Sequence, residues 1–220
     1  MQASTLISSS IESIHPAEDG SRALQMMEQF RVNHLAVVKN KYFLGVVSDK
    51  EIMNWQSTDE HIDEHLNNIA APHVKHNQHL FDIIEVLEKN NLSIVPVLDE
   101  ENHYLGIITS RKLMYTIAKS ATIQSVGGVI ILEMNSHDYS LTEIAGVVES
   151  NNAKILSSYI ISKPNSTNIE VTIKLNKQDI TAIIKDFERR DYKISASYKE
   201  KETDVDFSQR YESLMRFLNP

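Results

Sequence analysis

Apolar residues recur in the first half of the chain in two patterns, short runs typical of buried strands and stripes typical of helices. The runs cover residues 35–38, 43–47, 94–98 and 104–108, and polar turn residues separate the members of each pair. An apolar stripe at helical spacing predicts an amphipathic helix, formed by Leu80, Ile83, Ile84 and Leu87. We therefore expect strands and helices to alternate over residues 1–120, as in an α/β unit.

The same apolar pattern is present twice. The sequence LGVVS at 44–48 recurs as LGIIT at 105–109. Upstream of this motif, apolar residues of the two copies coincide at an offset of sixty, in the pairs Leu6 and Leu66, Ile14 and Val74, Leu24 and Ile84, Met27 and Leu87, and Val37 and Val97. Two copies with this long period indicate a paired module with pseudo-twofold symmetry. We divide this part into a first repeat, 1–60, and a second repeat, 61–120.

The pattern changes after residue 120. Residues 121–128 end in two glycines and are interpreted as a linker. Over 129–200, strand-like runs and helix-like stripes follow the order βαββαβ, which predicts a ferredoxin-like antiparallel sheet with helices on one face. Residues 201–220 begin with a charged stretch and continue as an amphipathic tail helix, which needs a docking surface because a short helix is marginal alone. Its apolar face holds Phe207, Tyr211, Leu214, Met215 and Leu218.

Composition excludes several functional classes. The net charge is −8, whereas general nucleic-acid binding needs a basic surface. The chain has no cysteine, so disulfides, thiolate metal sites and cysteine nucleophiles are excluded. The N-terminus does not resemble a signal peptide, and no run approaches the length of a membrane span. We expect a cytoplasmic protein without nucleic-acid or membrane partners.

The sequence contains no recognisable catalytic motif. A Walker-type phosphate loop and a GxSxG elbow are both absent, so we expect a protein that is not an enzyme. His61 and His65 have the i, i+4 spacing that would place two metal ligands on one face of a helix. Because the spacing fixes no third ligand, we interpret them as part of an exposed polar face and predict no metal site.

The repeated segment resembles a tandem pair of CBS domains, also called a Bateman module. The likeness rests on Gly45 and Gly106, on the hydroxyl residue three positions after each glycine, and on the sequence IVPV at 94–97. Residues 129–200 resemble an ACT domain, through LTEIAGVV at 141–148 followed by NAKI at 152–155. A CBS pair followed by an ACT-like domain is similar to the acetoin-utilisation accessory proteins, a regulatory family.

The resemblance implies a nucleotide site between the repeats. CBS pairs often hold adenosine nucleotides such as AMP, ADP or ATP as regulatory ligands, with no cofactor required. A hydroxyl lies near the phosphates, an aspartate three residues later binds the ribose, and apolar strand residues enclose the adenine. The corresponding residues here are Ser48 and Glu51 in the first repeat, Thr109 and Lys112 in the second, and Val37 and Pro96 on the strands.

Two of these positions depart from the family pattern. Glu51 keeps the acidic charge on a longer side chain, and Lys112 cannot accept a hydrogen bond from a ribose. Ser48 and Glu51 also form a capping-box sequence, which explains both residues without a ligand and is compatible with one. Lys112 either faces a bound phosphate or points into solvent. If the pair binds a ligand, we expect its two clefts to be unequal.

The second resemblance implies an effector site in the ACT-like domain. Such domains bind amino acids or other small effectors near the turn after the first strand, at a dimer interface. Asp138 lies in this turn and could hold an amino group, and Ser140 stands where the family has a glycine. The alternatives are a solvated loop carboxylate and a helix N-cap. We expect a regulatory, ligand-sensing homodimer; the alternative is a ligand-free interaction or dimerisation module.

Overall fold

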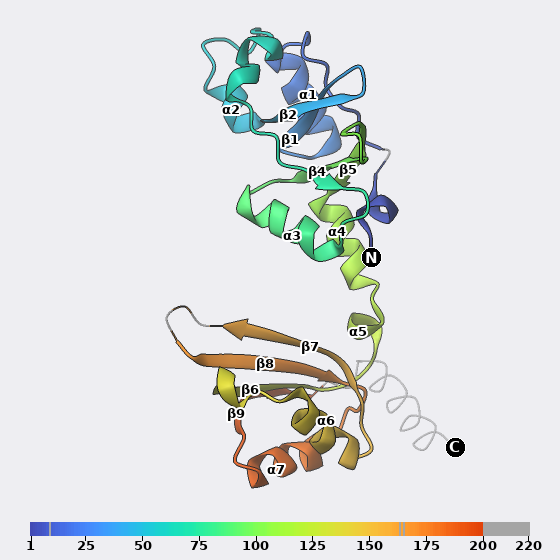
Figure 1. The fold of residues 1–220 in the computed structure, drawn as a ribbon, viewed down its shortest axis with the longest axis vertical. Helices are drawn as coiled ribbons and strands as arrows, with labels where there is room; N and C mark the ends of the chain where they lie inside the picture. Colours follow the sequence, from blue (N-terminus) through green and yellow to red (C-terminus); the bar gives the residue numbers. More distant parts are fainter. Residues whose placement is uncertain (9, 163, 165, 200–220) are drawn as a thin grey trace, which may run out of the picture. The chain divides into compact units, whose positions relative to one another are not determined.

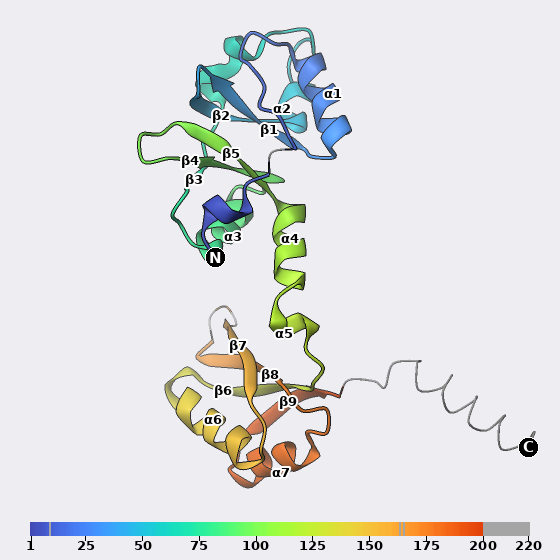
Figure 2. The same ribbon diagram turned by 90° about the vertical axis from the view of Figure 1, so that its right-hand side faces the viewer.

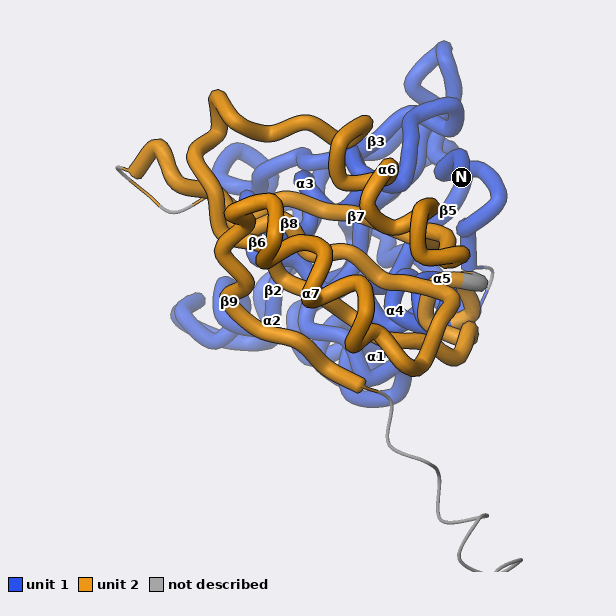
Figure 3. The backbone as a smooth tube through the Cα atoms, turned by 90° about the horizontal axis from the view of Figure 1, so that it is seen from below, with its two compact units in different colours: residues 1–118 blue, residues 119–220 orange. Residues whose placement is uncertain are grey.

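The computed structural model describes residues 1–8, 10–162, 164 and 166–199 and divides the chain into two compact units (Figure 3). Unit 1 comprises residues 1–118, and unit 2 begins at residue 119. Each contains its own hydrophobic core. Helices and sheets are combined as the sequence predicts, so the mixed α/β (α+β) class is confirmed. No helix of the described residues is long and apolar enough to cross a membrane.

Unit 1 consists of two similar halves, each with a β-hairpin between two helices (Figure 1). The first half contains α1 (Gly20–Phe30), β1 (His34–Lys39), β2 (Tyr42–Ser48) and α2 (Asp49–Met53). The second half contains β3 (Val74–Lys75), α3 (Leu80–Lys89), β4 (Ile94–Leu98), β5 (Tyr104–Thr109) and α4 (Ser110–Ala118). A short 3₁₀ helix precedes the elements of each half, η1 (Ala3–Leu6) and η2 (Ile62–Asn68).

The short segment at the start of each sequence repeat packs against the other half. Ala3 and Leu6 are buried in the core of the second half, and the Ala3 backbone N–H donates to Gln78 O at 2.9 Å. Conversely, Ile62 is buried in the core of the first half, and its N–H donates to Glu18 O at 3.0 Å. The spatial halves therefore exchange their first segments relative to the sequence repeats.

This exchange explains the glycine of the repeated LG motif. Residues 69–70 cross β2 at Gly45, where a Cβ would lie 2.9 Å from Ala70 O. Ile7 crosses β5 at Gly106 in the same way, and a Cβ there would lie 2.6 Å from Ile7 Cγ2. A glycine at this position leaves room for the exchanged segment, which is why both copies contain it.

Unit 2 is a four-stranded antiparallel sheet with two helices on one face (Figure 2). The strand order is β7-β8-β6-β9, which is the ferredoxin-like arrangement of the βαββαβ order predicted from the sequence. Its elements are β6 (Val129–Asn135), η3 (Ser136–Asp138), α6 (Leu141–Ser150), β7 (Ile155–Ser162), β8 (Asn168–Leu175), α7 (Thr181–Arg189) and β9 (Lys193–Tyr198). Alternate residues of β6 and β8 pack under the helices and form the core of the unit.

Two predicted segments need comment. The linker expected at 121–128 contains a short helix, α5 (Ala121–Gln124), which two residues separate from the end of α4. The side chain of Thr122 donates a hydrogen bond to Leu156 O on β7 at 3.4 Å, so α5 is attached to unit 2. The expected tail at 201–220 lies outside the described residues.

Candidate functional site

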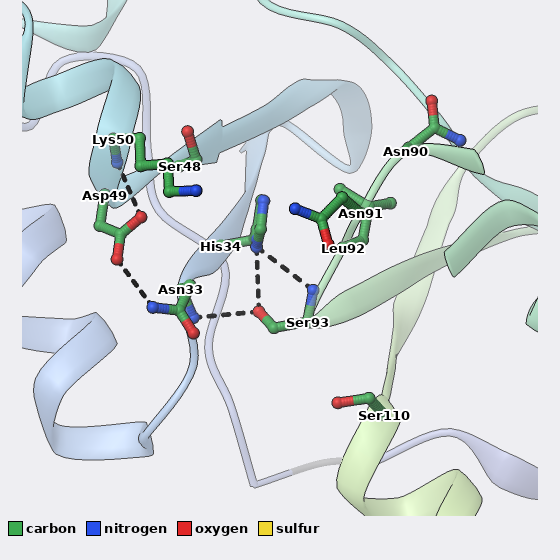
Figure 4. Close-up of a pocket in the computed structure, with 10 residues that line it drawn as sticks. All are labelled: Asn33, His34, Ser48, Asp49, Lys50, Asn90, Asn91, Leu92, Ser93 and Ser110. Carbon is green, nitrogen blue, oxygen red and sulfur yellow. Dashed lines mark hydrogen bonds between the residues drawn. The ribbon is translucent and has the colours of Figure 1, made fainter. Parts of the chain in front are cut away.

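A polar pocket of about 440 Å³ opens between the two halves of unit 1 (Figure 4). The first half contributes the start of β1 and the junction between β2 and α2. The second half contributes the loop after α3 and the start of α4. The lining residues are Asn33, His34, Ser48, Asp49, Lys50, Asn90, Asn91, Leu92, Ser93 and Ser110.

The same backbone motif leads into the pocket from each half of unit 1. A residue with a left-handed backbone follows each of helices α1 and α3, Arg31 (φ 56°) directly after α1 and Asn91 (φ 49°) two positions after the last residue of α3. In both cases the next residue donates its N–H back into the helix, from Val32 to Met27 O and from Leu92 to Leu87 O, each at 3.0 Å. This helix-ending motif turns the chain sharply toward the following strand.

Asn33 and Ser93 occupy the same position in the two repeats, immediately before β1 and β4. The carbonyl of Asn33 accepts from Asp49 N at 3.0 Å, and the carbonyl of Ser93 accepts from Ser110 N at the same distance. The Asn33 side chain also donates to Asp49 Oδ2 at 2.7 Å. These bonds fix the first turn of α2 and of α4 beside the pocket.

Hydrogen bonds cross the pocket floor from one half to the other. Ser93 Oγ accepts from Asn33 N at 3.0 Å and lies 3.1 Å from His34 Nδ1. The Ser93 N–H donates to the same nitrogen at 3.2 Å, so His34 Nδ1 acts as an acceptor. Burial lowers the pKa of His34, although Asp49 and Glu51 oppose this effect. A neutral imidazole matches the acceptor role that this bond requires.

Comparison with known proteins assigns this architecture. Residues 3–58 and 68–119 match the family model of the CBS domain. Unit 1 is a tandem CBS domain pair.

Several solved structures resemble part of this chain. A CBS domain pair/ACT domain protein from Thermotoga maritima is 16% identical, with a TM-score of 0.48, over 55% of this chain and 99% of that one. CBSX2 in complex with AMP is 17% identical, with a TM-score of 0.44, over 54% and 96%. The CBS domain of a bacterial CNNM/CorC family Mg²⁺ transporter in complex with ATP is 12% identical, with a TM-score of 0.44, over 54% and 87%.

The capping box expected in the first repeat of the CBS pair is present. Ser48 Oγ accepts from Glu51 N at 3.1 Å, and Glu51 Oε2 accepts from Ser48 N at 2.7 Å and from Ser48 Oγ at 2.6 Å. Ser48 lines the pocket, whereas Glu51 is not among the lining residues. The two side chains expected to meet a phosphate and a ribose therefore hydrogen-bond to each other.

The other residues expected at the nucleotide clefts lie outside this pocket. Thr109 Oγ1 accepts from Lys112 N at 3.0 Å at the start of α4, and the Lys112 residue is exposed. Val37 is buried in the core of the first half, paired with Gly45. Pro96 is buried in β4, opposite Ile107. The hydroxyl residue at the start of α4 that lines the pocket is Ser110, not the expected Thr109 next to it.

Sequence reasoning missed most of the pocket. Asn33, His34, Ser93 and the asparagines after α3 were not among the expected site residues. One signal was available, because Asn33 and Ser93 are polar residues at the same repeat position, directly before a strand. Their contact depends on how the two halves pack, which periodicity does not reveal.

Unit 2 has a separate pocket of about 300 Å³ beside the end of β6. Asp138 is one of its lining residues, whereas Ser140 is the N-cap of α6 and accepts from Glu143 N at 3.3 Å. Lys193 pairs with Glu133 at 2.9 Å in this pocket. Tyr192 donates to Glu143 Oε2 at 3.2 Å, and burial together with this carboxylate raises the pKa of Tyr192.

The two histidines with metal-pair spacing have separate structural contacts. His61 precedes η2, and its Nδ1 lies 2.7 Å from Ala17 O. His65 Nε2 lies 2.8 Å from Glu60 Oε2, and its ring stacks on Trp55 with 3.9 Å between centroids. Among the described residues, no group of three or more potential ligands is placed to hold a metal ion.

Proposed function

We propose that the CBS pair senses an adenine nucleotide or a related small anion in the pocket between its two halves. The observation that carries this proposal is that both repeats supply pocket walls, at the starts of α2 and α4. A ligand that touches both halves stabilises one packing of the pair over another, in proportion to its difference in affinity for the two. This is the physical requirement for a regulatory sensor, and it needs no catalytic group.

The charges in the pocket favour a ligand with few negative charges. Lys50 is the one cationic side chain among the residues that line it, and the Asp49 carboxylate lies next to it. The hydroxyls and amides of the remaining polar residues suit ribose hydroxyls and the edges of a base. A monophosphate finds one cation to pair with, whereas a triphosphate brings negative charges that these residues do not balance. We therefore expect AMP to bind more tightly than ATP.

Thermal unfolding with added AMP, ADP and ATP tests this proposal. Ligand at one hundred times its Kd adds about 2.7 kcal/mol to the stability of the folded protein. We expect Lys50→Ala to abolish the shift caused by AMP. Lys112→Ala is the matched control, because Lys112 is an exposed lysine in the first turn of α4 outside the pocket. No shift with any nucleotide at millimolar concentration would refute the proposal, and equal loss in both variants would refute the role of this pocket.

One observation favours a second function, a ligand-free interaction or dimerisation module. Glu51 and Ser48 satisfy each other in the capping box, so neither requires a ligand. A module of this kind would self-associate while its melting temperature stays unchanged with every nucleotide. Native mass spectrometry of the purified protein separates the two, since it reports the oligomeric state and any retained nucleotide together.

For unit 2 we propose an ACT-like role, in which the domain dimerises and takes a second effector in the pocket beside β6. Asp138 would pair with the amino group of an amino acid, and the nearby Tyr192 and Glu143 provide further polar contacts. Thermal unfolding with the twenty amino acids, compared between the native chain and Asp138→Asn, tests this role. Stabilisation that survives the substitution would show that Asp138 is not a ligand contact.

A further inference from the structure

One face of the sheet in unit 2 has apolar side chains that the two helices do not cover. Residues of β6 and β8 alternate between the core under α6 and α7 and the opposite side of the sheet, which we call the open face. Ile130, Leu132, Val171 and Ile173 belong to the core. Their neighbours and strand partners on the open face include Val129, Ile131, Thr172, Tyr159, Ile161, Ala196 and Tyr198.

The strand register places these side chains side by side. Ala196 is opposite Ile131, Ile131 is opposite Thr172, and Thr172 is opposite Tyr159, so one row crosses all four strands. Beside this row, Tyr198 is opposite Val129. Tyr159, Ile161 and Tyr198 are 56%, 49% and 60% exposed. The open face therefore has one row of mainly apolar residues across all four strands, with large exposed side chains at both sheet edges. The flanking rows also contain charged residues, namely Lys174 on one side and Glu133, Glu170 and Lys193 on the other.

The sequence that follows the sheet supplies a matching surface. Strand β9 ends at Tyr198, itself on the open face, and 21 residues after Lys199 lie outside the described structure. Within them, apolar residues at helical spacing predict one apolar stripe, formed by Phe207, Tyr211, Leu214, Met215 and Leu218. An isolated helix of this length is marginal in water and gains most of its stability from packing.

We propose that this C-terminal segment, residues 207–218, docks with its apolar stripe on the open face of its own unit 2. The connection from Lys199 to Phe207 can span about 26–29 Å, at 3.3–3.6 Å per residue. A four-stranded sheet is only about 14 Å wide between its outer strands, so the segment reaches every part of the face. As a helix, the segment would be about 18 Å long, shorter than the roughly 27 Å of an eight-residue strand.

The short connection also decides between this chain and a second copy as the source of the segment. A short flexible link holds two binding surfaces at an effective concentration of about millimolar. A second copy at micromolar concentration competes poorly with a segment tethered in this way. This proposal stands apart from the nucleotide proposal, because it involves only unit 2 and the residues that follow it.

Crosslinking tests the proposal cleanly, because the native chain has no cysteine. One variant of the full chain combines Tyr159→Cys on the open face with Ser208→Cys beside the apolar stripe. The control combines Ser208→Cys with Lys185→Cys, which replaces an exposed residue of α7 on the helical side of the sheet. A short bismaleimide is added at low protein concentration, and the products are separated by mass.

We expect the first pair to form an intramolecular crosslink at least tenfold faster than the control pair. Adding Leu214→Asp and Leu218→Asp should remove this difference, because the stripe loses its apolar character, while the folded sheet is left intact. Equal rates for the two pairs would overturn the proposal. Predominant crosslinking between two chains would also overturn it and would assign the open face to a second copy.

Discussion

Leu6 provides the sharpest test of the segment exchange in unit 1. Residues so close to a chain terminus are usually frayed, and their substitution has little effect. Here Leu6 is only 3% exposed and packs in the core of the second half with Val95 and Ile108. Replacing a buried leucine by alanine costs about 2–5 kcal/mol, since it removes apolar contacts and leaves a cavity. We therefore expect Leu6→Ala to destabilise unit 1 by about 3 kcal/mol.

Urea denaturation followed by the fluorescence of Trp55 measures this loss. Trp55 is the only tryptophan of the chain and stacks on His65 in the first half, so its signal reports on unit 1. With a urea dependence of about 2 kcal/mol per molar, a loss of 3 kcal/mol lowers the midpoint by roughly 1.5 M. Thr5→Ala is the control, because Thr5 is exposed and its hydroxyl bonds only to Gln2 O at 2.7 Å within the same turn.

The control should change stability by less than about 0.5 kcal/mol. If Leu6→Ala also changes the free energy of unfolding by less than that amount, the N-terminal segment does not belong to the core of the second half. The reasoning on the exchange would then be refuted, together with the explanation of the two glycines.

Two further predictions concern a titrating group and a helix position. Burial lowers the pKa of His34, so the folded protein keeps the imidazole neutral while the unfolded chain takes up a proton near pH 6.5. The contribution of His34 to stability is complete above pH 6.5 and falls as the pH drops through 6.5 toward the lowered value. Urea titrations of the native chain and His34→Gln between pH 7.5 and 5 should show a shallower pH dependence in the variant; parallel curves would contradict the assignment. Gly146→Ala in α6 should stabilise unit 2 by about 0.5–1 kcal/mol, because the added methyl meets no atom within 4 Å. Calorimetry of unit 2 unfolding measures this gain, and a loss would show that the helix needs the glycine.

The elements of both units could be predicted from the sequence because the buried side of a helix or strand requires apolar residues at regular spacing. The stripe of Leu80, Ile83 and Leu87 predicted α3. In β8, apolar residues stand at every second position from Ile169 to Leu175, which is the pattern of a strand with one buried face. Local hydrogen bonding was equally readable, since the capping box of Ser48 and Glu51 involves residues three positions apart.

Contacts between segments that are distant in the sequence could not be predicted from this spacing. The packing of residues 3–6 among the strands of the second half could not be predicted, because their apolar pattern would be the same if they packed in the first half. The pocket residues were missed for a related reason. Asn33 and Ser93 are polar residues in loops, and their significance arises only when the pseudo-twofold packing brings them within 3.0 Å of each other.

The exchange of first segments between the halves has a consequence for how this module is made. During synthesis, the first half cannot complete its core until residues 62–70 have left the ribosome, when most of the second repeat has not yet been made. The second half, in turn, needs residues 3–6, which precede all the elements of the first half in the chain. Neither repeat is therefore a separable folding unit. A gene fragment encoding one repeat alone would yield a chain that lacks part of its hydrophobic core. The two repeats therefore form an obligate pair, joined by the exchanged segments at residues 3–6 and 62–70.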